Sequence, residues 1–114
     1  NIYVADTWNL RVVVFSPEGK YISSFNVQGW GSSSVDNKPY LSVGPDNRIY
    51  LTDPEGYRVI VFSAAGEPLA AFGQYGSEDG SFGLPNGLTI SPDGSLWIVD
   101  AGNNRVVKYP PIQP

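Results

Sequence analysis

Three stretches of the chain share one pattern: IYVADTWNLRVVVF at residues 2–15, IYLTDPEGYRVIVF at 49–62 and LWIVDAGNNRVVKY at 96–109. They align without a gap at a spacing of 47 residues, and each places an aspartate five positions before an arginine, between two apolar runs. A fixed period of this length is typical of repeat architectures, in which every copy builds the same structural unit. The fold therefore has to be inferred from the repeat.

The repeat extends beyond these stretches. Gly19 recurs as Gly66, Phe25 as Phe72, and the dipeptide at 45–46 as the dipeptide at 92–93. In the middle copy the pattern predicts four strands, near 40–43, 48–52, 58–62 and 68–72. The second and third are apolar almost throughout, as expected when both faces of a sheet are covered. Sheets of four strands that cover one another predict an all-β fold, a β-propeller with four-stranded antiparallel blades.

The 114 residues hold about two and a half repeats, so we expect an incomplete arc of about 2.5 blades rather than a closed ring. The first blade would lack its innermost strand and the last its outermost, which gives ten strands arranged three, four and three. No segment has the 3.6-residue period of a long helix. The blades predicted on this basis are residues 1–38, 39–85 and 86–114.

Three stretches of the chain resemble motifs of a known family. The sequences IYVADTWNLRV at 2–12, WIVDAGNNRV at 97–106 and LPNGLTISPDG at 84–94 resemble the NHL repeat, and the likeness covers essentially the whole chain. The resemblance implies a six-bladed propeller, or a piece of one. The histidine common in that family between the asparagine and the arginine is Leu10 in the first copy and Asn104 in the third, and the middle copy has Gly56 in place of the asparagine.

The aspartate and arginine of each copy face one another across a predicted hairpin, where they can bond to each other or to turn amides. An active site needs one arrangement of charges, whereas this arrangement occurs in every copy. Repetition therefore indicates a structural role. The three pairs are Asp6 with Arg11, Asp53 with Arg58, and Asp100 with Arg105.

Composition excludes several kinds of chemistry. The chain has no His and no Cys, which removes imidazole-dependent triads, thiolate sites and disulfides. Seven basic against eleven acidic residues give a net charge of −4, which disfavours nucleic acid as a partner. No apolar stretch approaches the ~20 residues of a membrane span, and no charged-then-apolar leader precedes the first strand, so we expect no direct membrane insertion.

Residues 77–81, SEDGS, could offer hard oxygen ligands to calcium, but they lack the alternating spacing of a dedicated loop, and a solvated acidic turn is the simpler interpretation. The glycines between 73 and 87 resemble a phosphate-binding loop only superficially, since no helix follows them. We therefore expect no catalytic residue, no metal and no cofactor.

Loop lengths indicate where a ligand would bind. The turns from first to second and from third to fourth strand are short, whereas the second-to-third tips and the crossings 26–39 and 73–86 are longer and vary more. We expect these to gather at one end, called here the loop face, with exposed aromatic and amide groups typical of recognition surfaces. An alternative for Trp30 and Tyr75 is packing between blades. The candidate ligand-binding residues are Trp8, Trp30, Tyr57, Tyr75, Asn86 and Asn103.

Two classes of function remain. The first is a non-catalytic binding or scaffold module for a protein or carbohydrate ligand; the family resemblance implies an extracytoplasmic location within a larger secreted or membrane-bound protein. The second is part of a propeller enzyme of lyase or lactonase type, with a metal in the central channel. The predicted inner strands offer Ser42, Thr89 and Asn86 but no carboxylate or imidazole, which favours the first class.

An open arc exposes the apolar flanks that neighbouring blades normally cover. We therefore expect the flanks to be covered by the remaining blades of a larger propeller or by a second copy. Alone, the segment should be poorly stable or self-associate.

Overall fold

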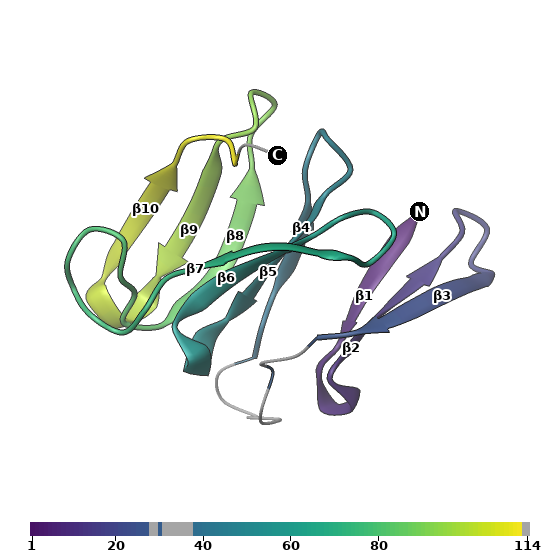
Figure 1. Ribbon diagram of the computed structural model, residues 1–114, viewed down its shortest axis with the longest axis horizontal. Helices are drawn as coiled ribbons and strands as arrows, with labels where there is room; N and C mark the ends of the chain where they lie inside the picture. The colour runs from purple at the N-terminus through teal and green to yellow at the C-terminus, as the bar shows by residue number, and fades with distance from the viewer. Residues whose placement is uncertain (28–29, 31–37, 113–114) are drawn as a thin grey trace.

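A computed structural model describes residues 1–27, 30 and 38–112, and in them the chain forms ten strands in three antiparallel sheets (Figure 1). The prediction of sheets with three, four and three strands is confirmed. Part of the crossing 26–39 lies outside the described residues.

The first sheet contains β1 (Ile2–Asp6), β2 (Arg11–Phe15) and β3 (Tyr21–Asn26). The second contains β4 (Leu41–Val43), β5 (Ile49–Asp53), β6 (Arg58–Phe62) and β7 (Pro68–Phe72). The third contains β8 (Pro85–Ile90), β9 (Leu96–Asp100) and β10 (Arg105–Tyr109).

The strands pair in the register that the sequence repeat predicts. In the second sheet Asp53 pairs with Arg58, and in the first and third sheets the same two repeat positions pair. All five residues of β5 are buried, as the continuous apolar run predicts for a strand covered on both faces. Ile49 and Leu51 pack toward the first sheet, whereas Tyr50 packs toward the third. The second sheet is therefore the middle layer of the arc.

Trp30 belongs to the core between the first two sheets. Its side chain is 2% exposed, and its indole N–H donates a 3.1 Å hydrogen bond to the backbone oxygen of Thr52. The expectation that Trp30 projects from the loop face is wrong, and the alternative of packing between blades holds. An indole can take either place because it has a large apolar body and a single donor that needs a partner when buried.

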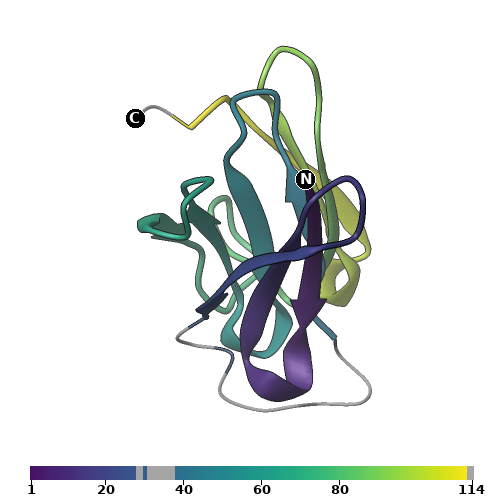
Figure 2. The same cartoon turned by 90° about the vertical axis from the view of Figure 1, so that its right-hand side faces the viewer.

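The connections at the upper and lower edges of the sheets differ in structure. The turns between β4 and β5 and between β8 and β9 lie at the upper end in Figures 1 and 2, and each is closed by short backbone hydrogen bonds across four residues. At the lower end each second-to-third connection forms one 3₁₀ turn. These turns are η1 (Thr7–Asn9), η2 (Pro54–Gly56) and η3 (Ala101–Asn103). In the part of the chain that the structure describes, no helix has the length and apolar character needed to cross a membrane.

Each 3₁₀ turn is followed by one residue in the left-handed backbone region: Leu10 at φ 54°, Tyr57 at φ 58° and Asn104 at φ 53°. The backbone N–H of that residue bonds back to the first residue of the turn. This is the position at which the three copies differ from the histidine of the family pattern. The conformation is needed in all three, but only asparagine adopts it readily.

The left-handed position supplies a stability test. Asn104 is exposed, so Asn104→Val changes little packing but forces a β-branched residue to positive φ. We expect the free energy of unfolding to fall by roughly 1 to 2 kcal/mol, the cost of that conformation for an ordinary residue. Urea unfolding followed by tryptophan fluorescence measures it. Asn104→Gly is the control and should change the value by less than about 0.5 kcal/mol; an equal loss would contradict a backbone origin.

Candidate ligand-binding site on the loop face

The three repeated aspartate–arginine pairs all form. Arginine Nε donates to aspartate Oδ2 at 2.9 Å in the first copy, 3.0 Å in the second and 3.1 Å in the third. The predicted contact of Asp53 with Arg58 across its hairpin is therefore observed. The carboxylates differ in burial: the side chain is 28% exposed at Asp6, 7% at Asp53 and fully buried at Asp100.

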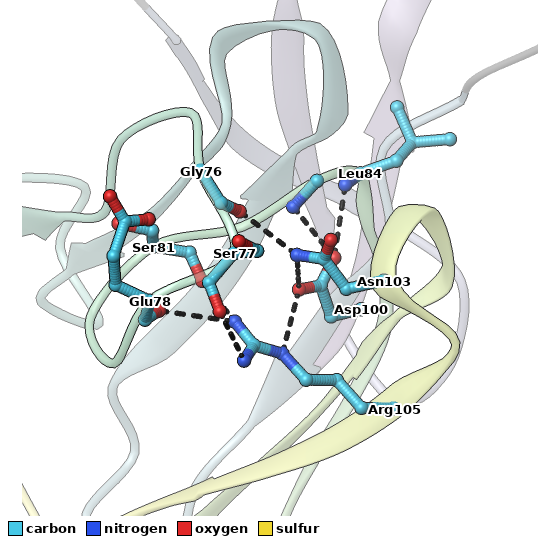
Figure 3. A network of polar contacts seen from close by, with 9 residues as sticks. Gly76, Ser77, Glu78, Ser81, Leu84, Asp100, Asn103 and Arg105 are labelled. Carbon is cyan, nitrogen blue, oxygen red and sulfur yellow. Dashed lines mark hydrogen bonds and ion pairs between the residues drawn. The ribbon is translucent and has the colours of Figure 1, made fainter.

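Asp100 is the centre of a hydrogen-bond network at the lower end of the third sheet (Figure 3). Its Oδ1 accepts from the backbone N–H groups of Gly83 at 2.9 Å and Leu84 at 3.0 Å. Its Oδ2 accepts from the Asn103 amide at 2.8 Å and from Arg105. A buried carboxylate is stabilised only when its lone pairs are used in this way. Asp100 therefore joins η3 to the crossing that leads into β8.

Arg105 holds the same crossing from the other side (Figure 3). Its two terminal nitrogens donate to the backbone oxygens of Ser77 at 2.9 Å, Glu78 at 3.2 Å and Ser81 at 2.8 Å. The Asn103 amide adds a bond to the oxygen of Gly76 at 2.9 Å. The planar guanidinium can reach several acceptors at once because its donors are fixed in a fork. We call this set of contacts the crossing clamp: Asp100, Asn103 and Arg105 bound to residues 76–84.

The clamp determines the electrostatics of Asp100. Burial opposes its ionisation, but the hydrogen bonds from the Leu84 N–H, Asn103, the Gly83 N–H and Arg105 outweigh burial and lower its pKa below the ordinary value. At Asp6 the bonds from Asn9 and Arg11 lower the pKa as well. Both carboxylates are therefore ionised at neutral pH, and each faces its own arginine as an ion pair.

The crossing approaches η3 closely at two glycines. A Cβ atom on Gly102 would lie 2.5 Å from the carbonyl carbon of Gly83 and 2.7 Å from the nitrogen of Leu84. Real Cβ atoms do not approach backbone at such distances. The corresponding positions of the other copies are Trp8 and Glu55, which carry full side chains. This close contact is therefore particular to the third copy.

The acidic segment 77–81, considered above for calcium, directs the backbone oxygens of Ser77, Glu78 and Ser81 at Arg105. The backbone N–H groups of Glu78 and Ser77 lie beside the Glu78 carboxylate and lower its pKa. Among the described residues, no group of three or more acidic side chains gathers as a metal site would require. The segment serves the clamp with its main chain.

Two of the sequence candidates come together on the loop face. Tyr57, which follows η2, and Tyr75, in the crossing, form an edge-to-face pair with ring centroids 4.8 Å apart. Tyr75 is 71% exposed. Beside it lies a pocket of about 220 Å³. The pocket is lined by Tyr75, Gly76, Ser77, Gly83, Gly102 and Asn103, without a charged side chain.

The other candidates take different places. Trp8 is 63% exposed on η1 of the first sheet, with the Lys38 ammonium 5.4 Å from its ring centroid. Asn86 lies at the irregular start of β8, where its side-chain oxygen is buried and has no hydrogen-bond partner among the described residues. Asn103 is at the pocket, but its amide nitrogen already donates to Gly76 and Asp100. Asn103 is thus a wall of the pocket rather than a free recognition group.

Sequence reasoning missed the contacts that Gly83, Gly102 and the oxygens of residues 76–81 make with the clamp. Every residue has a backbone oxygen, so the sequence does not indicate which of these oxygens accept hydrogen bonds. The sequence does single out Gly102, because it is a glycine at a position where the other copies have Trp8 and Glu55. Such a replacement indicates a close backbone approach.

Comparison with known proteins agrees with this architecture. The family model for the NHL repeat matches residues 82–109, which include β8, β9, η3, β10 and the three side chains of the clamp. No curated protein matches the sequence.

Among solved structures, virginiamycin B lyase from Staphylococcus aureus is similar with a TM-score of 0.64 and 16% identity, over 98% of this chain and 38% of that one. A streptogramin B lyase has a TM-score of 0.57 and 17% identity, over 90% and 34%. A catalytically inactive virginiamycin B lyase from Staphylococcus aureus with quinupristin has a TM-score of 0.56 and 17% identity, over 92% and 36%. This chain thus spans less than two fifths of each structure, and at these identities the likeness shows the fold alone. Residues 82–109 therefore match the NHL repeat, and the chain has the fold of a part of a β-propeller.

Proposed function

We propose that the chain is a non-catalytic binding segment of a β-propeller, which presents its loop face to a protein or carbohydrate ligand. The observation that carries the proposal is the exposed Tyr75 ring, supported from behind by Tyr57 and bordered by the 220 Å³ pocket. A rigid aromatic ring beside backbone polar groups suits a sugar ring or a single peptide side chain, because both combine an apolar face with hydrogen-bonding edges.

The clamp supports the same function indirectly. Tyr75 lies in a crossing that Arg105 and Asn103 hold at Gly76 and Ser77, its next neighbours in sequence. The crossing therefore does not have to be ordered when a ligand arrives, which keeps more of the contact energy available for binding. On this account the repeated charges position the site, and the aromatic pair contacts the ligand.

A direct test uses Tyr75→Ala on the 114-residue chain. The chain would be screened against a glycan array of defined saccharides and a displayed random peptide library. For any ligand found, we expect Tyr75→Ala to weaken binding at least about tenfold, the scale of one lost aromatic contact. Tyr21→Ala is the matched control, since Tyr21 is similarly exposed (64%) but lies on β3 of the first sheet.

The two libraries also decide between a carbohydrate and a peptide ligand. Asp6→Asn should lower thermal stability slightly and leave ligand affinity unchanged, because that pair belongs to the hairpin of the first sheet, which carries neither Tyr57 nor Tyr75. A ligand whose affinity depends on Asp6 but not on Tyr75 would contradict the proposal, as would equal losses for Tyr75→Ala and Tyr21→Ala.

A second candidate is that the chain is part of a propeller enzyme of lyase or lactonase type. The observation favouring it is that the three similar structures named above are lyases. The strands β4 and β8, which lie next to each other, carry Ser42, Thr89 and Asn86. Incubation of the chain with quinupristin, followed by liquid chromatography, tests this candidate: turnover of the compound supports an enzyme, and unchanged compound favours the binding module.

A further inference from the structure

The pocket beside Tyr75 is built by the second and third copies of the repeat. Its walls come from the crossing 73–84 and from η3, and the Tyr57 ring that contacts Tyr75 follows η2. Figure 3 shows one side of it, where Gly76 and Ser77 of the crossing approach Asn103. Both copies that form this site are present in the chain, so its composition can be used to identify the chemistry of its ligand.

The pocket offers little apolar surface apart from one aromatic ring. Three of its lining residues are glycines, at positions 76, 83 and 102, so much of the wall is main chain. The exposed lining is more polar than apolar. An apolar peptide side chain would gain little by entering, because its binding energy comes from removing apolar surface from water. A ligand that fits has one apolar face for Tyr75 and polar groups elsewhere.

Asn103 holds a hydrogen-bond acceptor at a fixed place in the wall. Its Nδ2 donates to the Gly76 backbone oxygen at 2.9 Å and to Asp100 Oδ2 at 2.8 Å (Figure 3). Both partners are acceptors only, so the amide cannot turn over without losing both bonds. Its Oδ1 accepts no hydrogen bond within the described residues and is not among their buried polar atoms that lack a partner. Asn103 therefore cannot donate to a ligand, but it can accept from a hydroxyl or an amide N–H.

A negative charge lies beside the pocket without lining it. The Glu78 carboxylate is the group nearest to where a Cβ on Gly76 would lie, and Gly76 is one of the walls. Hydrogen bonds from the backbone N–H groups of Glu78 and Ser77 lower its pKa, so this carboxylate is ionised at neutral pH. It disfavours an acidic ligand, by a modest amount because Glu78 is exposed to solvent. A cationic ligand would find no acidic side chain in the lining to pair with. Both charge arguments favour a neutral ligand.

We propose that this site takes one residue of a neutral saccharide, an assignment that rests on the binding function proposed above. The C–H groups on one face of a pyranose ring lie on Tyr75, whose ring face carries the partial negative charge of the π-system. One hydroxyl or acetamido N–H of the same sugar donates to Asn103 Oδ1. Tyr57 is the positioning residue, because its ring meets that of Tyr75 edge to face at 4.8 Å and so restricts its rotation.

The test compares three sets of probes on the 114-residue chain. They are neutral disaccharides of glucose, galactose, mannose and N-acetylglucosamine, the same disaccharides with one ring oxidised to its uronic acid, and a displayed random peptide library. Saturation-transfer difference NMR detects weak sugar binding and reports which ligand protons lie against the protein. We expect a neutral disaccharide to bind, with saturation concentrated on the C–H protons of one ring face.

The variants test the ring and the charge separately. Tyr75→Leu keeps an apolar side chain but loses the flat ring, and it should weaken sugar binding at least about tenfold, whereas Tyr21→Leu on β3 should leave it unchanged. The uronic acid probe should bind about threefold more weakly than its neutral partner, the scale of one exposed charge. Glu78→Gln should reduce that difference. Asp79→Asn is its control, since Asp79 lines a different pocket. Circular dichroism checks that each variant is folded.

The outcomes separate the saccharide assignment from the binding function itself. Peptides that bind through Tyr75, without any sugar binding, would overturn the saccharide and leave a binding module in place. Tighter binding of the uronic acid probe than of its neutral partner would also overturn it, as would sugar binding that Tyr75→Leu does not weaken. Failure of every sugar and every peptide to bind the folded chain would overturn both proposals.

Discussion

Asp100→Asn is expected to lower the free energy of unfolding by about 3 kcal/mol, the range found when one member of a buried charged network is removed. The carboxylate is fully buried and accepts four hydrogen bonds. In the variant one of its two oxygens becomes an NH₂ group, which cannot accept from the donors on Asn103 and Arg105. The Asn103 amide and the positively charged Arg105 guanidinium then lose this acceptor. Urea unfolding at neutral pH, followed by tryptophan fluorescence, measures the loss.

Asp6→Asn is the matched control, because Asp6 occupies the same repeat position with the same neighbours at the third and fifth following residues. Its carboxylate is partly exposed and accepts from Asn9 and Arg11, both at 2.9 Å. Water can replace those bonds, so we expect a clearly smaller loss. Equal losses for the two variants would show that the hairpin pair alone, without the crossing, accounts for the stabilisation.

The Asp100 prediction has a pH signature. Its pKa is lowered in the folded protein, so the ionised carboxylate contributes stability that is complete above its unfolded value and is lost as pH falls. The free energy of unfolding of the wild type should therefore decline as pH drops below about 4, and the decline should be shallower in Asp100→Asn. Asp93 does not disturb this comparison. Bonds from Ser91 and Ser95 lower its pKa to about 2, and it is present in both proteins.

The sheets could be predicted from sequence because the repeat carries two independent signals. Apolar residues at successive positions, such as Ile49, Tyr50 and Leu51, mark a strand covered on both faces, and the fixed spacing of 47 residues gives the register of its equivalents. The two signals test each other, because a strand predicted in one copy must also fit the sequence at the equivalent positions of the other two copies. This is why the order of strands and the aspartate–arginine contacts agree with expectation.

The clamp could not be predicted because its strength depends on which chain segment passes nearby. Asp6 and Asp100 have the same local motif, yet one is partly exposed and the other is fully buried. Their difference comes from the crossing 73–84, whose partners are backbone groups. The left-handed backbone conformation of Leu10 could also not be predicted from the sequence, because leucine does not favour it and only the closure of η1 requires it. Local motifs thus identify the position, and tertiary neighbours determine what it does.

Gly102→Ala is expected to lower the free energy of unfolding by about 3 kcal/mol, at the upper end of the cost of overpacking a tight site. The added methyl would lie 2.5 Å from the carbonyl carbon of Gly83 and 2.7 Å from the nitrogen of Leu84. Backbone atoms cannot rotate away as a side chain can, so the crossing would have to move from η3. That movement would separate the Gly83 and Leu84 N–H groups from Asp100, whose two bonds to them measure 2.9 and 3.0 Å.

Gly87→Ala is the control for this change. Gly87 also lies in the third repeat, but a Cβ there would have its nearest neighbour, the Val99 side chain, at 4.0 Å. We expect a change within about 0.5 kcal/mol. The double variant Gly102→Ala with Asp100→Asn tests the mechanism: if the methyl acts by displacing the crossing, the two losses should overlap, and the double variant should lose clearly less than their sum. Full additivity would mean that Gly102 and Asp100 stabilise the molecule independently, and that residues 83 and 84 do not connect their effects.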